Sequence, residues 1–319
     1  MDVVSDAISA VRTGRASSRR VRVDGTWSAR LAPYEGAGFH VVLEGGCRLL
    51  TGAGEDLALG PGDAVLLPHG AEHVLADATA DAAAAARAVP FESWHAVSRT
   101  REQPDRVPPG AEPGRRERPG GPGEVELLCG KYRLDRSRAH PLMAELPEVV
   151  HLPNRVGRHP ELRSAIDLLG RELGEWRPGG GIAVPGLLDL LLVYMIRAWL
   201  DQDTAGAWPA VLGDPVVAAA LRALHEEPAA PWSNDRLAAE AGVSRATLAR
   251  RFTALVGRPP MAYLTWWRLT SAAALLRGTE DPLAAVARRV GYGTPYAFSH
   301  AFQREFGTTP GRYRAQTAP

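Results

Sequence analysis

The sequence predicts an α+β multidomain chain: an N-terminal β-barrel and a helical pair, then a C-terminal all-α domain of two helix-turn-helix motifs. Short β-type runs fill residues 27–77, two amphipathic segments follow between residues 159 and 201, and one short pattern occurs twice in the last hundred residues. A length of 319 residues with 45% hydrophobic residues suits about two domains. We expect boundaries at 1–153 for the barrel, 154–212 for a helical dimerisation and linker region, and 213–319 for the helix-turn-helix domain.

The barrel is predicted from β-type runs that are separated by Gly, Pro and Asp, such as FHVVLEG, CRLLTG and DAVLLP. Residues 62–77, GDAVLLPHGAEHVLAD, resemble the second motif of the cupin family, GxxxxxPxGxxHxxxN. The His of that motif is His73, and Asp77 stands where the family has Asn. The resemblance implies a cupin-like barrel.

The first cupin motif is where the chain departs from the family. Aligned on VLEGG at residues 42–46, the family's His-x-His and Glu metal ligands fall at Ala32, Tyr34 and Gly38, none of which replaces them. The sequence also lacks a Gly-rich phosphate loop and a nucleophile elbow. We therefore expect no metal, no other cofactor, no catalytic residue and no enzymatic activity, so that the barrel acts as a sensor.

Four barrel residues are candidates for effector or redox sensing: His40, Cys47, His73 and Cys129. Strand alternation places His40 on the face of Gly38 and Val42, which we expect to be the interior, together with His73. The two cysteines are the only ones in the chain, and a structural disulfide is not expected in the cytosol. Three interpretations stay open: buried inert thiols, a reversible thiol redox switch, or partial soft-metal ligation with the two histidines.

The barrel is followed by an insertion and then by helices. Residues 78–123 are rich first in alanine and then in Pro, Gly and charge, and we expect a disordered loop there, above all at 104–123. Residues 159–176 and 184–201 have apolar side chains at helical spacing, and residues 203–215 are predicted as a linker. The second helix is apolar on more than one side, so it packs against the barrel or forms a dimer interface.

The duplicated pattern predicts two helix-turn-helix motifs. The first copy has Ala238, Gly242 and Ser244, and the second has Ala287, Gly291 and Thr294. A small residue lets two helices approach, a glycine accepts positive φ in the turn, and a hydroxyl caps the second helix. In each copy the helix after the turn has an apolar stripe, Leu248 and Phe252 or Phe298, Phe302 and Phe306, which we expect to be buried.

The double motif, the connecting segment 261–277 and the closing run FGTTPGRYR at 306–314 resemble the DNA-binding domain of AraC-type transcriptional regulators. The resemblance covers residues 214–314 and implies two recognition helices in successive major grooves, about 34 Å apart. The outward residues expected to contact DNA are Ser244, Arg245, Thr247, Arg250, Arg251, Thr294, Tyr296, Ser299, His300, Gln303 and Arg304.

Charge supports the same division of the chain. Residues 213–319 contain 13 Arg and Lys against 8 Asp and Glu, a balance of +5, which leaves −4 for the rest because the whole chain has +1. Asp189 and Arg197 interrupt the longest apolar run, and the N-terminus lacks the apolar core of a signal peptide, so we expect a cytoplasmic protein without membrane association.

The predicted function is regulation of transcription by a homodimer that binds double-stranded promoter DNA under the control of an unknown effector. One alternative is a metal-dependent cupin enzyme fused to a DNA-binding domain. Another is an architectural DNA-binding protein with a filled barrel and no ligand control.

Overall fold

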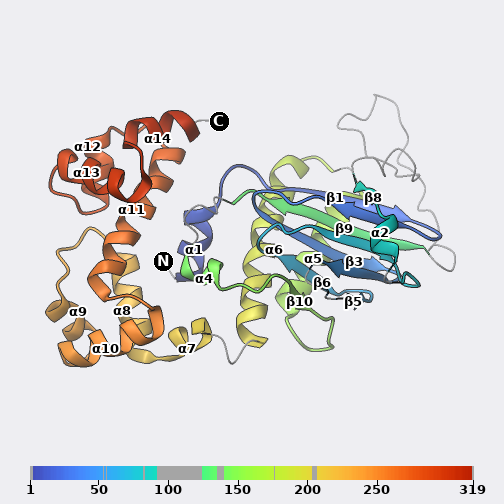
Figure 1. Cartoon of the computed structure of the whole chain (residues 1–319), viewed down its shortest axis with the longest axis horizontal. Helices are drawn as coiled ribbons and strands as arrows, with labels where there is room; N and C mark the ends of the chain where they lie inside the picture. Colours follow the sequence, from blue (N-terminus) through green and yellow to red (C-terminus); the bar gives the residue numbers. More distant parts are fainter. Residues whose placement is uncertain are drawn as a thin grey trace. The chain divides into compact units, whose positions relative to one another are not determined.

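The chain, seen here in a computed structural model, is described at residues 3–52, 54, 56–81, 83–91, 124–134, 140–175, 177–202 and 207–317. It forms two compact units, and Figure 1 labels most of their helices and strands. The helical unit consists of Met1–Gly14, Asp135–Glu145 and Trp199–Pro319, and the barrel unit of Arg15–Leu134 and Leu146–Ala198. The predicted boundaries at 153 and 212 do not coincide with these units, because two segments assigned to the barrel domain pack with the C-terminal helices.

Two five-stranded sheets form the β part of the barrel unit. One has the strand order β1-β9-β3-β6-β10 and the other β5-β4-β7-β2-β8, and all neighbours are antiparallel except β2 and β8. The strands are β1 Ser17–Val23, β2 Ser28–Leu31, β3 Ala37–Glu44, β4 Cys47–Thr51, β5 Asp56–Leu59, β6 Ala64–Leu67, β7 His73–Asp77, β8 Val89–Pro90, β9 Val125–Tyr132 and β10 Val150–Leu152.

The two sheets share one apolar core. Val42, Leu49, Leu75 and Leu127, from four different strands, are each at most 2% exposed and belong to one cluster. Successive side chains of a strand alternate between its faces, so His40 lies on the same face of β3 as Val42. The predicted cupin-like fold is confirmed. The face of β3 that carries His40 and Val42 is turned toward the apolar core, as the sequence predicted.

The predicted helical pair is present as α5 Pro160–Gly174 and α6 Gly180–Gln202. Among the described helices, α6 alone is long and apolar enough to span a membrane, with a mean hydropathy of 1.7, although Asp189 and Arg197 were expected to disqualify it. The helix resembles a membrane span in its length and composition only. Leu188 and Leu191 are fully buried, and the Tyr132 hydroxyl donates to the Leu188 carbonyl at 2.8 Å, but only 33% of the most apolar stretch of the helix is buried.

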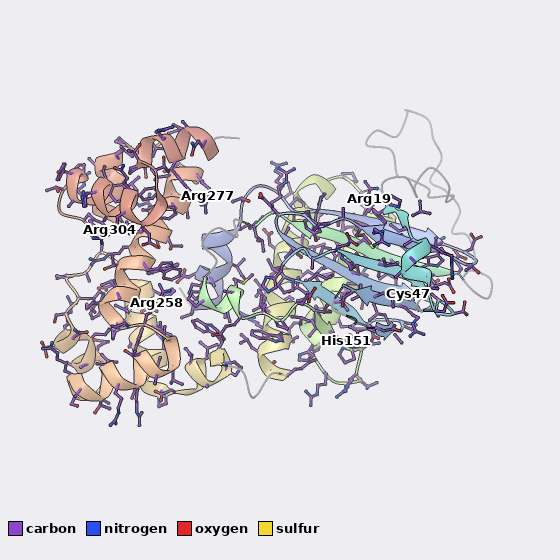
Figure 2. The ribbon with its side chains drawn as sticks, in the orientation of Figure 1. Arg19, Cys47, His151, Arg258, Arg277 and Arg304 are labelled. Atoms are coloured by element: carbon purple, nitrogen blue, oxygen red, sulfur yellow. The ribbon has the colours of Figure 1, made fainter. Side chains whose placement is uncertain are left out.

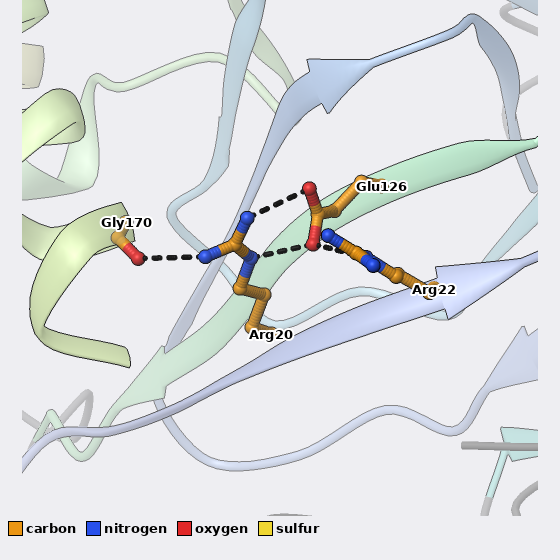
Figure 3. Close-up of polar contacts among 4 residues, drawn as sticks. All are labelled: Arg20, Arg22, Glu126 and Gly170. Carbon is orange, nitrogen blue, oxygen red and sulfur yellow. Dashed lines mark hydrogen bonds and ion pairs between the residues drawn. The ribbon is translucent and has the colours of Figure 1, made fainter. Parts of the chain in front are cut away.

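An ion-pair network ties β1 and β9 to α5. The Glu126 carboxylate, 2% exposed, accepts from Arg20 Nη2 at 2.8 Å and from Arg22 Nε at 2.8 Å, while Arg20 Nη1 donates to the Gly170 carbonyl at 3.1 Å (Figure 3). Burial opposes ionisation of Glu126, but the hydrogen bonds from the two arginines outweigh it and lower its pKa. One buried carboxylate thus fixes the position of both strands and, through Arg20, of the helix.

The start of the predicted disordered insertion is ordered. Residues 84–90 form α2 Ala84–Arg87 and β8, which extends the second sheet beside β2. The prediction was wrong here because small side chains fit an apolar patch: Ala80 and Ala84 pack with Leu50 and Val74. Residues 92–123, which include the segment 104–123, lie outside the described residues.

The remaining elements of the described chain are helices. They are α1 Val3–Val11, α4 Pro141–Ala144, α7 Ala207–Gly213, α8 Pro215–Glu226, α9 Asn234–Glu240, α10 Arg245–Val256, α11 Pro260–Gly278, α12 Leu283–Arg289, α13 Pro295–Phe306 and α14 Pro310–Thr317. Part of the predicted linker is therefore helical, as α7, because Trp208 and Val211 are buried to 1% exposure. Figure 1 shows α11 between the helices α8–α10 and the helices α12–α14.

A buried hydrogen-bonded chain joins α1, α8, α11 and α4 within the helical unit. Asp6 Oδ2 lies 2.8 Å from His225 Nδ1, and the Tyr263 hydroxyl lies 2.8 Å from His225 Nε2 and 3.0 Å from His140 Nε2. All four residues are at most 3% exposed. Because α1 and α4 supply two of the four groups, these short helices are structural parts of the unit that carries the helix-turn-helix motifs.

The hydrogen-bond partners assign every proton of this chain. The Leu142 amide donates to His140 Nδ1 at 3.2 Å, so a neutral His140 carries its proton on Nε2 and donates to Tyr263. Tyr263 then donates to His225 Nε2, and His225 Nδ1–H donates to the Asp6 carboxylate. Burial is the largest cause that lowers the pKa of His140 well below its ordinary value, and the electrostatic influence of the His225 ring and of the Arg258 charge acts in the same direction, which agrees with a neutral ring.

Replacing Glu126 with Ala is expected to lower the free energy of unfolding by about 2–4 kcal/mol, because it leaves two arginines without their buried acceptor. Denaturant unfolding of the full chain at neutral pH measures the change. Glu35→Ala, at an exposed loop position, is the matched control and should change stability by less than about 0.5 kcal/mol. Equal effects of the two substitutions would contradict the assigned role of Glu126.

The helical unit is expected to lose stability on acidification because of His140. Its pKa is lowered in the folded state, so the unfolded chain takes up a proton first as pH falls below 6.5. The loss is about 1.4 kcal/mol for each pH unit below that value. Unfolding of the wild type and of His140→Gln between pH 7.5 and 5.5 measures it, with exposed His300→Gln as control. If the free energy of unfolding falls with pH equally steeply in the wild type and in His140→Gln, His140 is not the cause of the acid sensitivity.

Candidate nucleic-acid interface

The first helix-turn-helix motif consists of α9, a turn at residues 241–244, and α10. Ala238, 3% exposed, lies where the helices approach, and Gly242 has φ +68°. The Val243 amide donates to the Ala238 carbonyl at 3.0 Å, and the Ser244 hydroxyl accepts from the Thr247 amide at 3.2 Å. The small residue, the turn glycine and the cap thus have the geometry that the sequence predicted.

The second motif repeats this geometry in α12 and α13. Ala287 is fully buried, Gly291 has φ +84°, and the Tyr292 amide donates to the Ala287 carbonyl at 2.9 Å. Thr294 Oγ1 accepts from the Ala297 amide at 3.1 Å and caps α13. The same hydrogen bonds at equivalent positions show that the two copies are one structural motif used twice.

The apolar stripes of the two second helices are buried as predicted, with one exception. Leu248, Phe252, Phe298 and Phe302 are fully buried. Phe306 was expected to be buried and is half-buried, because it lies at the end of α13, where it stacks on Phe302 with ring centroids 4.2 Å apart.

Most residues expected to contact DNA are exposed. The exposed ones are Ser244, Arg245, Arg250, Arg251, Thr294, Tyr296, His300, Gln303 and Arg304, while Thr247 and Ser299 are half-buried. Tyr296 is 83% exposed, which is unusual for a large aromatic side chain at the start of a helix. Arg304, on α13, is labelled in Figure 2.

Two of these arginines have intramolecular partners. Arg251 Nη1 lies 3.5 Å from Asp214 Oδ2, and Asp214 also caps α8 by accepting from the Val216 and Val217 amides. Arg245 Nη1 lies 3.7 Å from Asp235 Oδ2, and both side chains are well exposed. Exposed pairs of this kind contribute little to stability. Arg245 is therefore free to leave its partner more readily than Arg251.

The closing run FGTTPGRYR has a packing role in this structure. The Tyr313 ring meets the rings of Phe302 and Phe306 at 5.4 and 5.3 Å and accepts a hydrogen bond from Arg277 at its hydroxyl. Arg314 Nη2 donates to the Asp281 carbonyl at 2.6 Å. These contacts fasten α14 to the second helix-turn-helix motif.

Sequence reasoning missed the buried polar groups of the helical unit. Asp6 and His140 lie far from the motifs in sequence, and no local pattern links them to His225. Arg268 was missed as well, although an arginine within the apolar run MAYLTWWRLTSAAALLR was a visible signal that a partner is needed.

The barrel candidates His40 and His73 are brought together, both 2% exposed, with their Nε2 atoms 2.8 Å apart. His73 Nδ1 lies 2.9 Å from the Ala71 carbonyl, which only accepts, so it carries the proton. His73 Nε2 of the neutral ring then accepts from His40 Nε2–H. Among the described residues, nothing lies within hydrogen-bonding distance of His40 Nδ1, which is left as a buried acceptor. Burial lowers the pKa of both rings.

Cys47 and Cys129 are buried free thiols. Burial raises the pKa of Cys47 to about 12, and burial raises the pKa of Cys129 as well. Cys129 is paired in register with His40 on the neighbouring strand, so it borders the histidine pair. Cys47, which is labelled in Figure 2, opens β4 in the other sheet. A buried thiol that stays protonated is a poor nucleophile and a poor metal ligand.

The cupin-like motif keeps a structural role. Asp77 Oδ2 accepts from the Trp27 amide at 3.1 Å and Oδ1 from the Thr79 amide at 3.0 Å. Burial opposes ionisation of Asp77, but these hydrogen bonds lower its pKa overall. Within the described part of the chain, no group of three or more His, Cys, Asp or Glu side chains is placed to hold a metal ion.

Comparison with known proteins matches both units. A family model described as Cupin matches residues 2–201, and one described as Helix-turn-helix domain matches residues 237–316. A Streptomyces antibioticus protein named as an AraC-like transcription regulator is 31% identical over 100% of both chains, and a Streptomyces lividans protein of the same name is 32% identical over 98% of both. The solved DNA-binding domain of AdpA with target DNA is 34% identical over 33% of this chain and 93% of its own, with a TM-score of 0.31.

Both family matches and the full-length relatives agree with the fold and with the duplicated motif. The chain belongs to the AraC-type transcriptional regulators, with a cupin domain ahead of its helix-turn-helix domain.

Proposed function

We propose that the protein is a cytoplasmic regulator that binds promoter DNA through α10 and α13 and whose binding is modulated through the cupin domain. The observation that carries the proposal is that two helix-turn-helix motifs with the same turn hydrogen bond and the same kind of cap are joined by one continuous helix, α11. Helix-turn-helix proteins place the second helix of the motif in the major groove, with its N-terminal residues at base edges. An enzymatic role is not proposed, because the relatives named above are named for regulation.

Base reading is assigned to one arginine in each recognition helix. Arg245 is the first residue of α10, its side chain is 64% exposed, and its Nη1 lies 3.7 Å from Asp235 Oδ2, which is a long ion pair. Arg304 lies on the exposed side of α13, opposite the buried Phe298 and Phe302. A guanidinium group can donate two hydrogen bonds to guanine. The other exposed candidates are assigned to phosphates or to further bases.

The barrel input is proposed to be a small molecule with a hydrogen-bond donor. The His40–His73 pair leaves one lone pair, on His40 Nδ1, buried and unsatisfied among the described residues. Such a group costs about 1–3 kcal/mol unless a partner is supplied, so a donor on a ligand would be favoured there. Thiol oxidation is the weaker mode of sensing, because both thiols are buried with raised pKa values.

The chain itself supplies a route from the barrel to the DNA-reading helices. Strands β1 and β9 pair with each other, and Arg19 is in register with Cys129 beside the histidine pair. Upstream of β1 is α1, and downstream of β9 is α4, the two helices that supply Asp6 and His140 to the network around Tyr263. A ligand that shifts these strands would act on the helical unit through both connections.

A homodimer is the assembly that we propose. Helix α6 leaves Ile182 84% exposed and Leu190 46% exposed, and Leu168 of α5 is 43% exposed. Large apolar side chains on neighbouring helices of one unit favour association with a second copy.

Replacing Arg245 or Arg304 with Ala is expected to weaken binding to a selected target duplex by about 1–3 kcal/mol, roughly 5- to 150-fold, and to relax the base preference at one position. Fluorescence anisotropy at fixed salt measures the affinity, and a randomised-site selection measures the preference. Arg222→Ala, on the exposed side of α8, controls for the loss of one charge. Footprints and preferences unchanged in both variants would refute the assignment.

The thiols are expected to be inert in the folded protein. A disulfide reagent such as dithionitrobenzoate should react with Cys47 and Cys129 at least about 100-fold more slowly than with the denatured chain, since the thiolate fraction and access are both small. A mild oxidant should leave DNA affinity unchanged in the wild type and in Cys129→Ser alike. Rapid native labelling of Cys129 with an oxidant response lost in Cys129→Ser would instead establish a redox switch.

A further inference from the structure

The two helix-turn-helix motifs meet at one side chain of the linking helix. Arg268, in the middle of α11, donates from Nε to the Pro228 carbonyl at 2.7 Å and from Nη2 to the Ala230 carbonyl at 2.8 Å. Both carbonyls belong to the loop between α8 and α9, which leads into the first motif. The guanidinium group therefore fixes that loop to α11.

The same guanidinium group lies against the turn of the second motif. A Cβ added at Gly291 would stand 2.9 Å from Arg268 Nη2 and 2.8 Å from the Ala229 Cα. Gly291 has φ +84°. Burial raises the pKa of the neighbouring Tyr292, and the positive charge of Arg268 opposes that shift. The loop of the first motif, Arg268 and the turn of the second motif thus form one junction.

From this junction we infer that Arg268 is a positioning residue that sets the separation and relative rotation of the two recognition helices. The planar fork of the guanidinium group holds two carbonyls at once, which an ammonium group on a flexible stem cannot reproduce. The half-buried Arg268 side chain holds the loop between α8 and α9 in one place. Gly291, which has no side chain, lets the turn of the second motif approach to contact distance. The two recognition helices then fit one spacing between their DNA half-sites and bind other spacings more weakly.

The inference rests on the proposed two-site reading of DNA and is tested by spacing. A duplex is first selected with the full-length wild type, and its two half-sites are mapped by hydroxyl-radical footprinting. One base pair is then inserted or removed between them, which rotates one half-site by about 34° relative to the other. The wild type should lose about tenfold or more in affinity for the altered duplexes.

The variants are Arg268→Met, Arg268→Lys and Gly291→Ala, each compared by the ratio of affinities for the original and altered duplexes. Arg268→Met should reduce the ratio of the two affinities by about threefold or more, because a loose junction adapts to other spacings. Arg268→Lys should give a ratio between those of the wild type and Arg268→Met. Gly291→Ala should shift the preferred spacing or flatten the preference, since its Cβ pushes the turn away. Arg222→Met removes one exposed charge from α8 and should keep the wild-type ratio.

A purely structural role would lower affinity for every duplex and leave the ratio unchanged, and that result would overturn the inference. Thermal unfolding identifies variants that fail to fold; if Arg268→Met is one of them, Arg268→Lys decides. If the wild type selects no duplex at all, the proposed function fails. If the wild type has a clear spacing preference and Arg268→Lys fully retains it, only the role of Arg268 is refuted.

Discussion

The hydrogen-bonded chain from His140 through Tyr263 and His225 to Asp6 is the interaction on which the helical unit depends. Each proton has one place in it, so all four buried groups are satisfied only when α1, α4, α8 and α11 are together. Buried polar networks specify a unique arrangement when they are complete and are costly when one member is missing. The helical unit is consequently completed by groups that lie ahead of β1 and between β9 and β10 in sequence.

The histidine pair of the barrel differs from this network in one respect. His73 is fixed by the Ala71 carbonyl and His40 by His73, but His40 Nδ1 ends the chain without a partner among the described residues. A complete network stabilises a single packing, whereas an open one leaves a specific requirement for a donor. This difference is why we propose sensing only for the histidine pair of the barrel, although burial lowers the pKa of His40, His73 and His140 alike.

Local patterns predicted what depends on local chemistry. The caps at Ser244 and Thr294, the turn glycines and, except for Phe306, the buried stripes follow from the sequence within a few residues of each position, and they were predicted correctly. Contacts across long sequence separations were not predictable, because Asp6 and His225 are 219 residues apart and neither sits in a motif. The alanine-rich segment near Ala84 was misjudged for the same reason, since its order comes from a patch on distant strands.

The same network limits how strongly the barrel can influence DNA binding under the proposed function. A signal can shift an equilibrium only by its differential free energy between two arrangements. Withdrawing α1 would leave His225 Nδ1–H without its acceptor, at a cost of about 1–3 kcal/mol, together with the apolar burial of Ala7 and Ile8. The lost hydrogen bond alone corresponds to a change in affinity of roughly 5- to 150-fold, and the lost apolar burial adds to it. The finite cost of opening the network therefore bounds the regulation that these helices can transmit.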